Sequence, residues 1–193
     1  LRQANYDLIG AMMAAGRYAN AKRQIEALLS PLLENPGDDA AYIMDLRNIL
    51  SEVYRQSGRI DQAIEELEAI YAMSPNDAGA NNNLSYTLAD TGRNVERAEK
   101  LVRFSLAQDP NSSASLDTLG WVLYKRGKFD EAACYLRRAL RAAQFSDPVI
   151  FDHLADTLYR MGEKAQAGRA WAKALTFCDP QGDPPPARDR MEL

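Results

Sequence analysis

Few side chains of this chain are suited to catalysis or metal binding, and they centre on one histidine. His153 is the only histidine, Asp152 precedes it, and Asp156 follows about one helical turn later. Imidazole and carboxylate groups at this spacing could hold a metal ion or exchange protons. A lone histidine on a helix is far more often structural or a peptide contact, and no Cys-x-x-Cys, His-Glu-x-x-His or glycine-rich phosphate loop accompanies it. The sequence therefore predicts no catalytic residue, no metal site, no cofactor and no enzyme.

Glycines at a nearly constant spacing divide the chain into repeats. Gly58, Gly92, Gly127 and Gly162 are separated by 34, 35 and 35 residues, and an earlier copy stands at Gly16. A period of this length is typical of stacked helical hairpins, in which each repeat contacts only its neighbours. Repeated helix pairs must therefore position any functional side chain, and the stacked pairs together form a long surface.

The fourth repeat shows the helix pair most clearly. Its first apolar stripe is Leu116, Leu119, Gly120 and Leu123, and a second stripe after Gly127 is Phe129, Ala132, Leu136, Ala139 and Leu140. Two stripes at helical spacing, separated by a glycine turn, predict two antiparallel amphipathic helices. The small residues Gly120 and Ala132 should let these helices approach closely, because a larger side chain would hold them apart.

This order of residues resembles the tetratricopeptide repeat, whose pattern runs aromatic, leucine, glycine, tyrosine, then alanine, phenylalanine and a closing proline. In the second repeat these places hold Leu50, Ser51, Tyr54, Gly58, Ile60, Ala63, Leu67 and Pro75. The third and fifth repeats match as well, and the first matches more weakly. The resemblance implies an all-α fold, a right-handed α-solenoid (superhelix) of antiparallel helix pairs whose first helices line a concave groove.

We expect residues 1–193 to form one such solenoid. The five repeats are expected at approximately residues 2–35, 44–77, 78–111, 113–146 and 148–181. Three prolines at 184–186 cannot continue a helix, whereas residues 187–193 could begin a truncated capping helix.

Two irregularities interrupt the period. Gly16 and Gly58 are 42 residues apart, so about eight extra residues lengthen either the helices or the loop around Pro31 to Asp39. In the third repeat, the turn that contains Gly92 and Asn94 has one additional residue before Val95. We expect local distortions at both places.

One face of each first helix is expected to line the groove, because it lies about 100° from the packing stripe. Short polar side chains on this face could hydrogen-bond an extended peptide backbone, and aromatic ones would concentrate binding energy. A solvated helix face carries similar polar residues, and the Trp121 indole, next to Gly120, could instead fill space between hairpins. The candidate partner-binding residues are Asn48, Glu52, Arg55, Asn82, Asn83, Tyr86, Asp117, Trp121, Tyr124, Asp152, His153, Asp156 and Tyr159.

Charges on this face favour a neutral or basic peptide. The acids are Asp45, Glu52, Asp90, Asp117, Asp152 and Asp156, and the bases are Arg55, Lys125 and Arg160.

Two binding arrangements known in subgroups of the family are disfavoured. The clamp for chaperone C-terminal carboxylates needs lysine and arginine where Ala114 and Thr118 stand, and the asparagine ladder that precedes a glycosyltransferase domain fits only Asn83.

Composition argues against other classes of partner. The formal charge is −4, with 23 basic against 27 acidic residues, so the chain lacks the basic field that nucleic-acid binding needs. No apolar run approaches the roughly 20 residues that span a bilayer, and no secretory signal begins the chain. The start at Leu1 indicates an excised or processed piece. Localisation stays open between the cytoplasm and, if a signal was removed, the periplasm.

These observations lead to one function and two alternatives. The favoured function is a non-enzymatic protein–protein interaction scaffold that binds a peptide or a partner protein in the concave groove. The first alternative is an architectural homo-oligomer, in which Ile9, Met12 and Met13 of the first repeat dock onto another copy. The second is a regulatory region of a larger enzyme.

Overall fold

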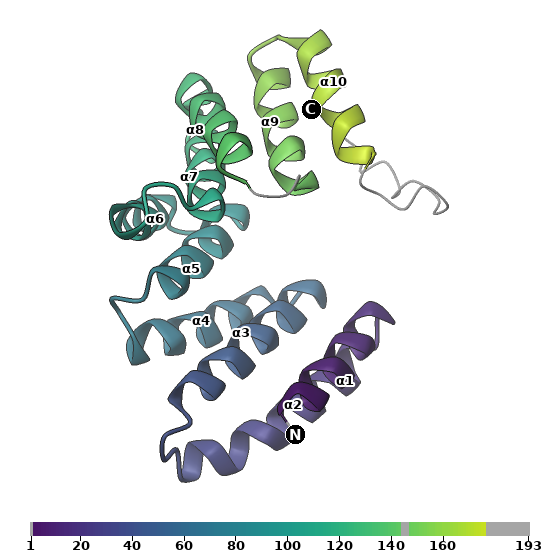
Figure 1. Ribbon diagram of the computed structural model, residues 1–193, viewed down its shortest axis with the longest axis vertical. Helices are drawn as coiled ribbons and strands as arrows, with labels where there is room; N and C mark the ends of the chain where they lie inside the picture. The colour runs from purple at the N-terminus through teal and green to yellow at the C-terminus, as the bar shows by residue number, and fades with distance from the viewer. Residues whose placement is uncertain (1, 144–146, 177–193) are drawn as a thin grey trace. The chain divides into compact units, whose positions relative to one another are not determined.

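Helices are the only regular elements among the residues that the structure describes. The computed structural model describes residues 2–143 and 147–176, and ten α-helices follow one another there (Figure 1). The expectation of an all-α helical repeat fold is confirmed. The chain divides into two compact units, with the boundary between Leu84 and Ser85. Residues 187–193, where we expect a capping helix, lie outside the described ranges.

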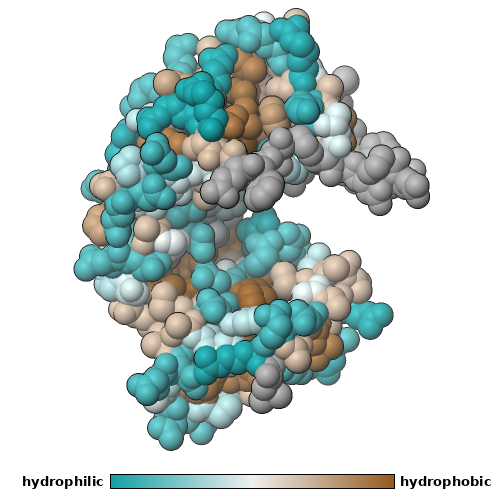
Figure 2. Space-filling model, in the orientation of Figure 1, coloured by the Kyte–Doolittle hydropathy of each residue, from teal (hydrophilic) through white to brown (hydrophobic). Residues whose placement is uncertain are grey.

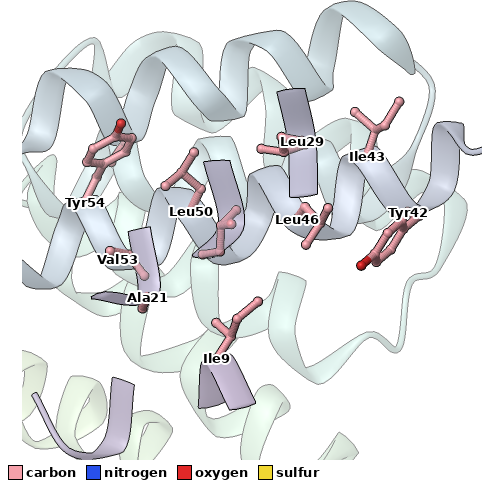
Figure 3. Close-up of a cluster of buried hydrophobic side chains, with 11 residues drawn as sticks. Ile9, Ala21, Leu29, Tyr42, Ile43, Leu46, Leu50, Val53 and Tyr54 are labelled. Atoms are coloured by element: carbon pink, nitrogen blue, oxygen red, sulfur yellow. The ribbon is translucent and has the colours of Figure 1, made fainter. Parts of the chain in front are cut away.

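The first unit contains α1 (Arg2–Ala14), α2 (Tyr18–Glu34), α3 (Ala40–Gln56), α4 (Ile60–Met73) and the beginning of α5 (Ala78–Asp90). Its core forms because apolar residues recur on α3 at helical spacing and meet those of α1 and α2. Figure 3 shows these side chains, among them Leu46, Leu50 and Val53 of α3 and Ile9 of α1. Ile9 and Leu46 are almost completely buried.

The extra residues between Gly16 and Gly58 lengthen two helices. Both α2 and α3 have 17 residues, whereas the helices from α6 onward have 12 to 14. Pro31 lies inside the last turn of α2, which ends at Glu34, and the Asn35 N–H then donates to the Pro31 carbonyl oxygen. The connection to α3 is therefore short, and the insertion forms additional helical turns.

The second unit continues with the end of α5, α6 (Val95–Gln108), α7 (Ser113–Lys125), α8 (Phe129–Ala142), α9 (Pro148–Arg160) and α10 (Lys164–Leu175). In Figure 1, α9 and α10 lie side by side, and α7 packs against α8. Apolar residues of α7 to α10 form one core, with Leu116, Leu136, Ile150 and Leu158 buried in it.

Hydrophilic residues cover much of the visible face of each unit. Figure 2 shows them on the outer sides of the helices, with hydrophobic residues gathered between the helices of the same unit. This distribution is the one that amphipathic helices produce when their apolar stripes pack together. None of the described helices is both long and apolar enough to span a bilayer.

The turns between paired helices depend on left-handed backbone. Gly127 has a φ of 75°, and the Lys128 N–H donates to the Leu123 carbonyl oxygen at 2.9 Å, which closes the last turn of α7. The additional residue of the third repeat is Asn94. It adopts a φ of 44°, and its side-chain oxygen accepts a hydrogen bond from the Arg97 N–H at the start of α6. The extra residue thus becomes a helix cap.

Close approach of α7 and α8 depends on Gly120. A Cβ atom at this position would lie 2.6 Å from Leu136 Cγ and 3.3 Å from the Ala132 carbonyl oxygen. The role that we expect for Gly120 as a small contact residue is confirmed. This packing holds α7 closely against α8, and α7 carries the side chains at the centre of the candidate site.

Candidate partner-binding face

A buried polar contact joins α7 and α9 in the second unit. His153 Nδ1 lies 2.9 Å from Asp117 Oδ1 and 3.2 Å from Oδ2, and both side chains are almost completely buried. The imidazole and the carboxyl group thus share a hydrogen bond at a buried position. The histidine therefore contacts the neighbouring first helix, although Asp152 and Asp156 are closer to it in the sequence.

Trp121 stands between two other rings. Its indole stacks on His153 with centroids 4.2 Å apart and on Tyr124 with centroids 4.7 Å apart. The indole Nε1–H donates to Asp90 Oδ1 at 3.2 Å, which connects α7 to the end of α5. Stacking and a satisfied indole N–H hold the ring in one orientation. We call Asp90, Asp117, Trp121, Tyr124 and His153 the aromatic–acid cluster.

Charged side chains cover the edge of this cluster. Lys125 Nζ donates to the Asp90 backbone oxygen at 3.1 Å and lies 4.6 Å from the centroid of the Trp121 ring. The Arg160 guanidinium lies 6.0 Å from the Tyr124 ring centroid and 4.9 Å from that of Phe129. Both bases keep their positive charge over these rings, but the carboxylates of Asp90, Asp117, Asp152 and Asp156 outnumber them on this face.

The candidate residues of the second unit differ in exposure. Asp117, Trp121 and His153 are 8%, 7% and 5% exposed, so a ligand could touch little of them. Tyr86, Tyr124, Asp152, Asp156 and Tyr159 are half-buried. Tyr159 packs against Trp171, whose Nε1–H donates to Asp156 Oδ1 at 3.2 Å. The accessible part of the face consists of tyrosines and aspartates around a buried aromatic centre.

In the first unit, the expected face carries a short polar ladder. The Asn83 side-chain amide donates to Asn48 Oδ1 at 3.2 Å. One turn along α3, the Glu52 carboxylate accepts hydrogen bonds from Arg55 at 2.6 and 2.7 Å and from Gln56 at 2.6 Å. Burial raises the pKa of Glu52, but the hydrogen bonds from Arg55 and Gln56 and the Arg55 charge lower it more, so the net pKa is below its ordinary value. Asn82 is half-buried.

Tyr6 and Tyr42 lie next to Asp45 of the expected face, although the repeat pattern did not indicate either tyrosine. The Tyr6 hydroxyl donates to Asp45 Oδ2 at 2.9 Å, and its ring meets Tyr42 edge-on at 5.8 Å between centroids. Burial and the hydrogen bond to Asp45 raise the pKa of Tyr6 to about 12. The first repeat deviates from the period, so aligning it with the later repeats could not place Tyr6 beside α3.

Contacts between first helices join positions about 35 residues apart. Asn48 meets Asn83 and Asp117 meets His153, whereas Asn82 and Asp152 hold the positions that the alignment made equivalent. In these two pairs the side chain contacts the position that comes one residue after its equivalent in the next repeat. The offset follows from the angle between adjacent hairpins, which the sequence pattern does not contain.

The surface that motivated self-association is smaller than expected. Ile9 is 1% exposed and belongs to the core of the first unit (Figure 3), while Met12 and Met13 are half-buried against that core. Leu8, 45% exposed, is the large apolar side chain that α1 presents to solvent. The expectation that Ile9 docks onto another copy is wrong, because the side chain points into its own unit.

Paired amphipathic helices, glycine turns and a face of aromatic and polar side chains define an all-α helical repeat protein. Two family models, both described as Tetratricopeptide repeat, match residues 54–119 and 118–183, which together are more than half of the chain. The chain belongs to the tetratricopeptide-repeat family. Proteins of this family generally act as interaction scaffolds and are generally not catalysts. In broad terms, the function of this chain is to interact with other proteins.

Solved structures agree with this fold. A thermophilic TPR protein of Thermus thermophilus aligns with a TM-score of 0.74 and 24% identity, over 94% of this chain and 93% of its own. PilF of Pseudomonas aeruginosa aligns with a TM-score of 0.66 and 22% identity, over 90% and 76%. MamA of Desulfovibrio magneticus aligns with a TM-score of 0.62 and 12% identity, over 94% and 97%. At these identities the likeness concerns the fold. No curated protein matches the sequence.

Proposed function

We propose that the face of α7 and α9 around the aromatic–acid cluster in the second unit, which we call the first-helix face, binds an extended segment of a partner protein. We propose further that this segment is neutral to basic. The observation that carries the proposal is the aromatic–acid cluster, in which Trp121 is fixed by stacking and by its bond to Asp90. This buried centre holds the half-buried tyrosines and aspartates around it in place, and accessible aromatic side chains of this kind supply much of the binding energy of an interface.

Charge supports the choice of partner. Lys125 and Arg160 lie over aromatic rings, while Asp152 and Asp156 add acidic groups on α9. Lysine or arginine side chains of a bound segment would be attracted to these carboxylates and would pack on the tyrosine rings. Peptide amides would pair with the aspartates of this face.

A charge-only substitution tests this proposal without removing the buried centre. Short random peptides displayed on phage are panned against the purified chain, and an enriched peptide is resynthesised and titrated by calorimetry. The double variant Asp152→Asn, Asp156→Asn should bind it roughly tenfold more weakly. The matched control Asp130→Asn, Glu131→Gln removes two charges from α8 and should leave the affinity unchanged. Equal effects of the two double variants would discard the face as the binding site.

Self-association is the competing function. Leu8 is the specific observation that favours it, since this leucine is 45% exposed on the first helix. Light scattering across a concentration series, on the chain and on Leu8→Glu, separates the alternatives. A chain that stays monomeric up to high concentration excludes assembly as its function, whereas an oligomer that Leu8→Glu dissociates would support it.

A further inference from the structure

A cavity on the second helices of the second unit has no role in the face described above. Its volume is about 260 Å³, and its apolar lining comes from Leu106, Ala107, Pro110 and Leu119. Arg103 of α6 and Tyr135 and Arg138 of α8 complete the lining. Sites for drug-sized ligands usually measure about 300–1,000 Å³, so this cavity suits one large side chain better than a whole cofactor.

The arginines give this cavity a positive rim. Arg138 Nη2 lies 3.5 Å from the Pro110 carbonyl oxygen, and its guanidinium is 5.3 Å from the Tyr135 ring centroid. Within the described ranges Arg138 has no carboxylate partner. Arg103 does pair with Glu99, at 2.7 Å, but Arg126 pairs with the same carboxylate. One carboxylate is therefore paired with two arginines there, and Arg138 adds a positive charge that no acid of the described residues balances.

We propose that this cavity binds a partner segment in which one large apolar side chain is flanked by aspartate or glutamate. The apolar side chain would enter the cavity and displace water from the leucine and proline surface. A flanking carboxylate would pair with the fork of N–H donors on Arg138, which matches the planar carboxylate group. Tyr135 keeps that guanidinium in place from one side.

The two binding surfaces would then select opposite charges. The first-helix face carries aspartates around Trp121, whereas the described residues that line the cavity on α6 and α8 include two arginines and no acid. This second site is independent of the function proposed for the first-helix face. A chain with both sites could hold two different partners at once, which is how a scaffold brings proteins together.

The test uses a fluorescein-labelled peptide, Ser-Glu-Glu-Leu-Glu-Glu-Ser, and fluorescence anisotropy with the full chain. We expect saturable binding that weakens with salt and is lost when alanine replaces the leucine of the peptide. Arg138→Gln should weaken binding roughly tenfold, the effect of removing one charged hydrogen-bonding partner. Arg137→Gln is the matched control, since it removes the same charge from the adjacent exposed position, and it should change the affinity less than about twofold.

A second variant distinguishes loss of the binding site from loss of the fold. Ala107 is exposed on α6 and lines the cavity, so Ala107→Glu keeps a good helix former and adds a carboxylate that can reach Arg138. It should abolish binding of the peptide while the circular dichroism spectrum stays unchanged. The double variant Asp152→Asn, Asp156→Asn should leave this affinity within about twofold, which separates the two sites.

Several outcomes would overturn the proposal. These are no binding of the leucine peptide, equal binding of the alanine peptide, or equal weakening by Arg137→Gln and Arg138→Gln. Decanoate is the competing probe, because a fatty acid also joins an apolar body to a carboxylate. Binding of decanoate that depends on Arg138, without binding of the peptide, would make the cavity a fatty-acid site and would overturn the partner-segment proposal.

Discussion

His153 of α9 and Asp117 of α7 share a hydrogen bond of 2.9 Å at a buried position, and the same histidine ring stacks on Trp121. These contacts link two successive first helices through polar groups, next to the apolar core that joins their hairpins. Since repeats of this kind contact only their neighbours, the strength of each such link determines whether adjacent repeats unfold together.

Removing His153 should weaken the link. In His153→Ala, the Asp117 carboxylate loses its partner at a site with little water, and Trp121 loses one of its stacked rings. We expect the free energy of unfolding, measured in urea, to fall by about 1–3 kcal/mol. Asp117→Ala should cost less when His153 is already alanine, with a coupling energy of about 0.5–3 kcal/mol.

The control for this cycle pairs Asp117→Ala with Glu131→Ala. Glu131 is exposed at the start of α8 and belongs to a different part of the unit. These two substitutions should be additive to within about 0.5 kcal/mol. An additive result for His153 and Asp117 as well would mean that their hydrogen bond contributes nothing to stability.

Two glycines on helices of the second unit should respond to alanine with opposite signs. At Gly120 the new Cβ would lie 2.6 Å from Leu136 Cγ and close to the Ala132 backbone, so the helices must move apart. We expect Gly120→Ala to destabilise the chain by about 1–3 kcal/mol. At Gly168 of α10 no atom lies within 4 Å of the added Cβ, and alanine should stabilise by about 0.5–1 kcal/mol.

Thermal unfolding followed by circular dichroism measures both variants. Gly120→Ala should lower Tm, and Gly168→Ala should raise it. If Gly120→Ala raised Tm as much as Gly168→Ala, helix propensity alone would govern both sites and the close approach of α7 and α8 would not depend on glycine.

Acid should remove the stabilisation that Glu99 provides. Burial raises the pKa of Glu99, but hydrogen bonds from Arg103 and Arg126 lower it more, so the folded pKa lies below the ordinary 4.5. A group whose folded pKa is depressed contributes stability above its unfolded pKa and loses it as pH falls through the folded pKa. The difference in unfolding free energy between the natural chain and Glu99→Gln should therefore be largest above about pH 4.5 and shrink below it.

Urea unfolding at a series of pH values measures this difference. Glu131→Gln serves as the control, because its ion pair with Lys128 is exposed and long, at 3.4 Å, and should contribute about 0–1 kcal/mol. A Glu99→Gln penalty that stayed constant from neutral pH to strong acid would show that lost packing, and not the carboxylate charge, causes it.

The helix pairs could be predicted from sequence because they follow from local rules. Apolar residues at helical spacing define the packing side of each helix, and a glycine such as Gly127 ends the first helix in left-handed backbone. The same reasoning found the small contact at Gly120. The sequence pattern locates Asn94 as an additional turn residue, but its function as a helix cap needed the observed φ of 44°.

The choice of partners for the site residues needed the tertiary structure. Repeat alignment placed Asp117 level with Asp152, yet its contact is His153, and Asn48 contacts Asn83. Ile9, expected on a docking surface, lies in the core, because its side chain packs with apolar residues of α2 and α3. The one-residue offset depends on how successive hairpins rotate, and no periodicity within a single hairpin contains that angle.

The helical repeats, their turns and the side of each helix that packs follow from the order of the amino acids, because hydrophobic periodicity and backbone sterics act over a few residues. Packing between helices places Trp121 between Tyr124 and His153 and brings Arg103 and Arg138 to one cavity. Those arrangements join side chains from different hairpins, so they depend on packing geometry between helices that are distant in the chain.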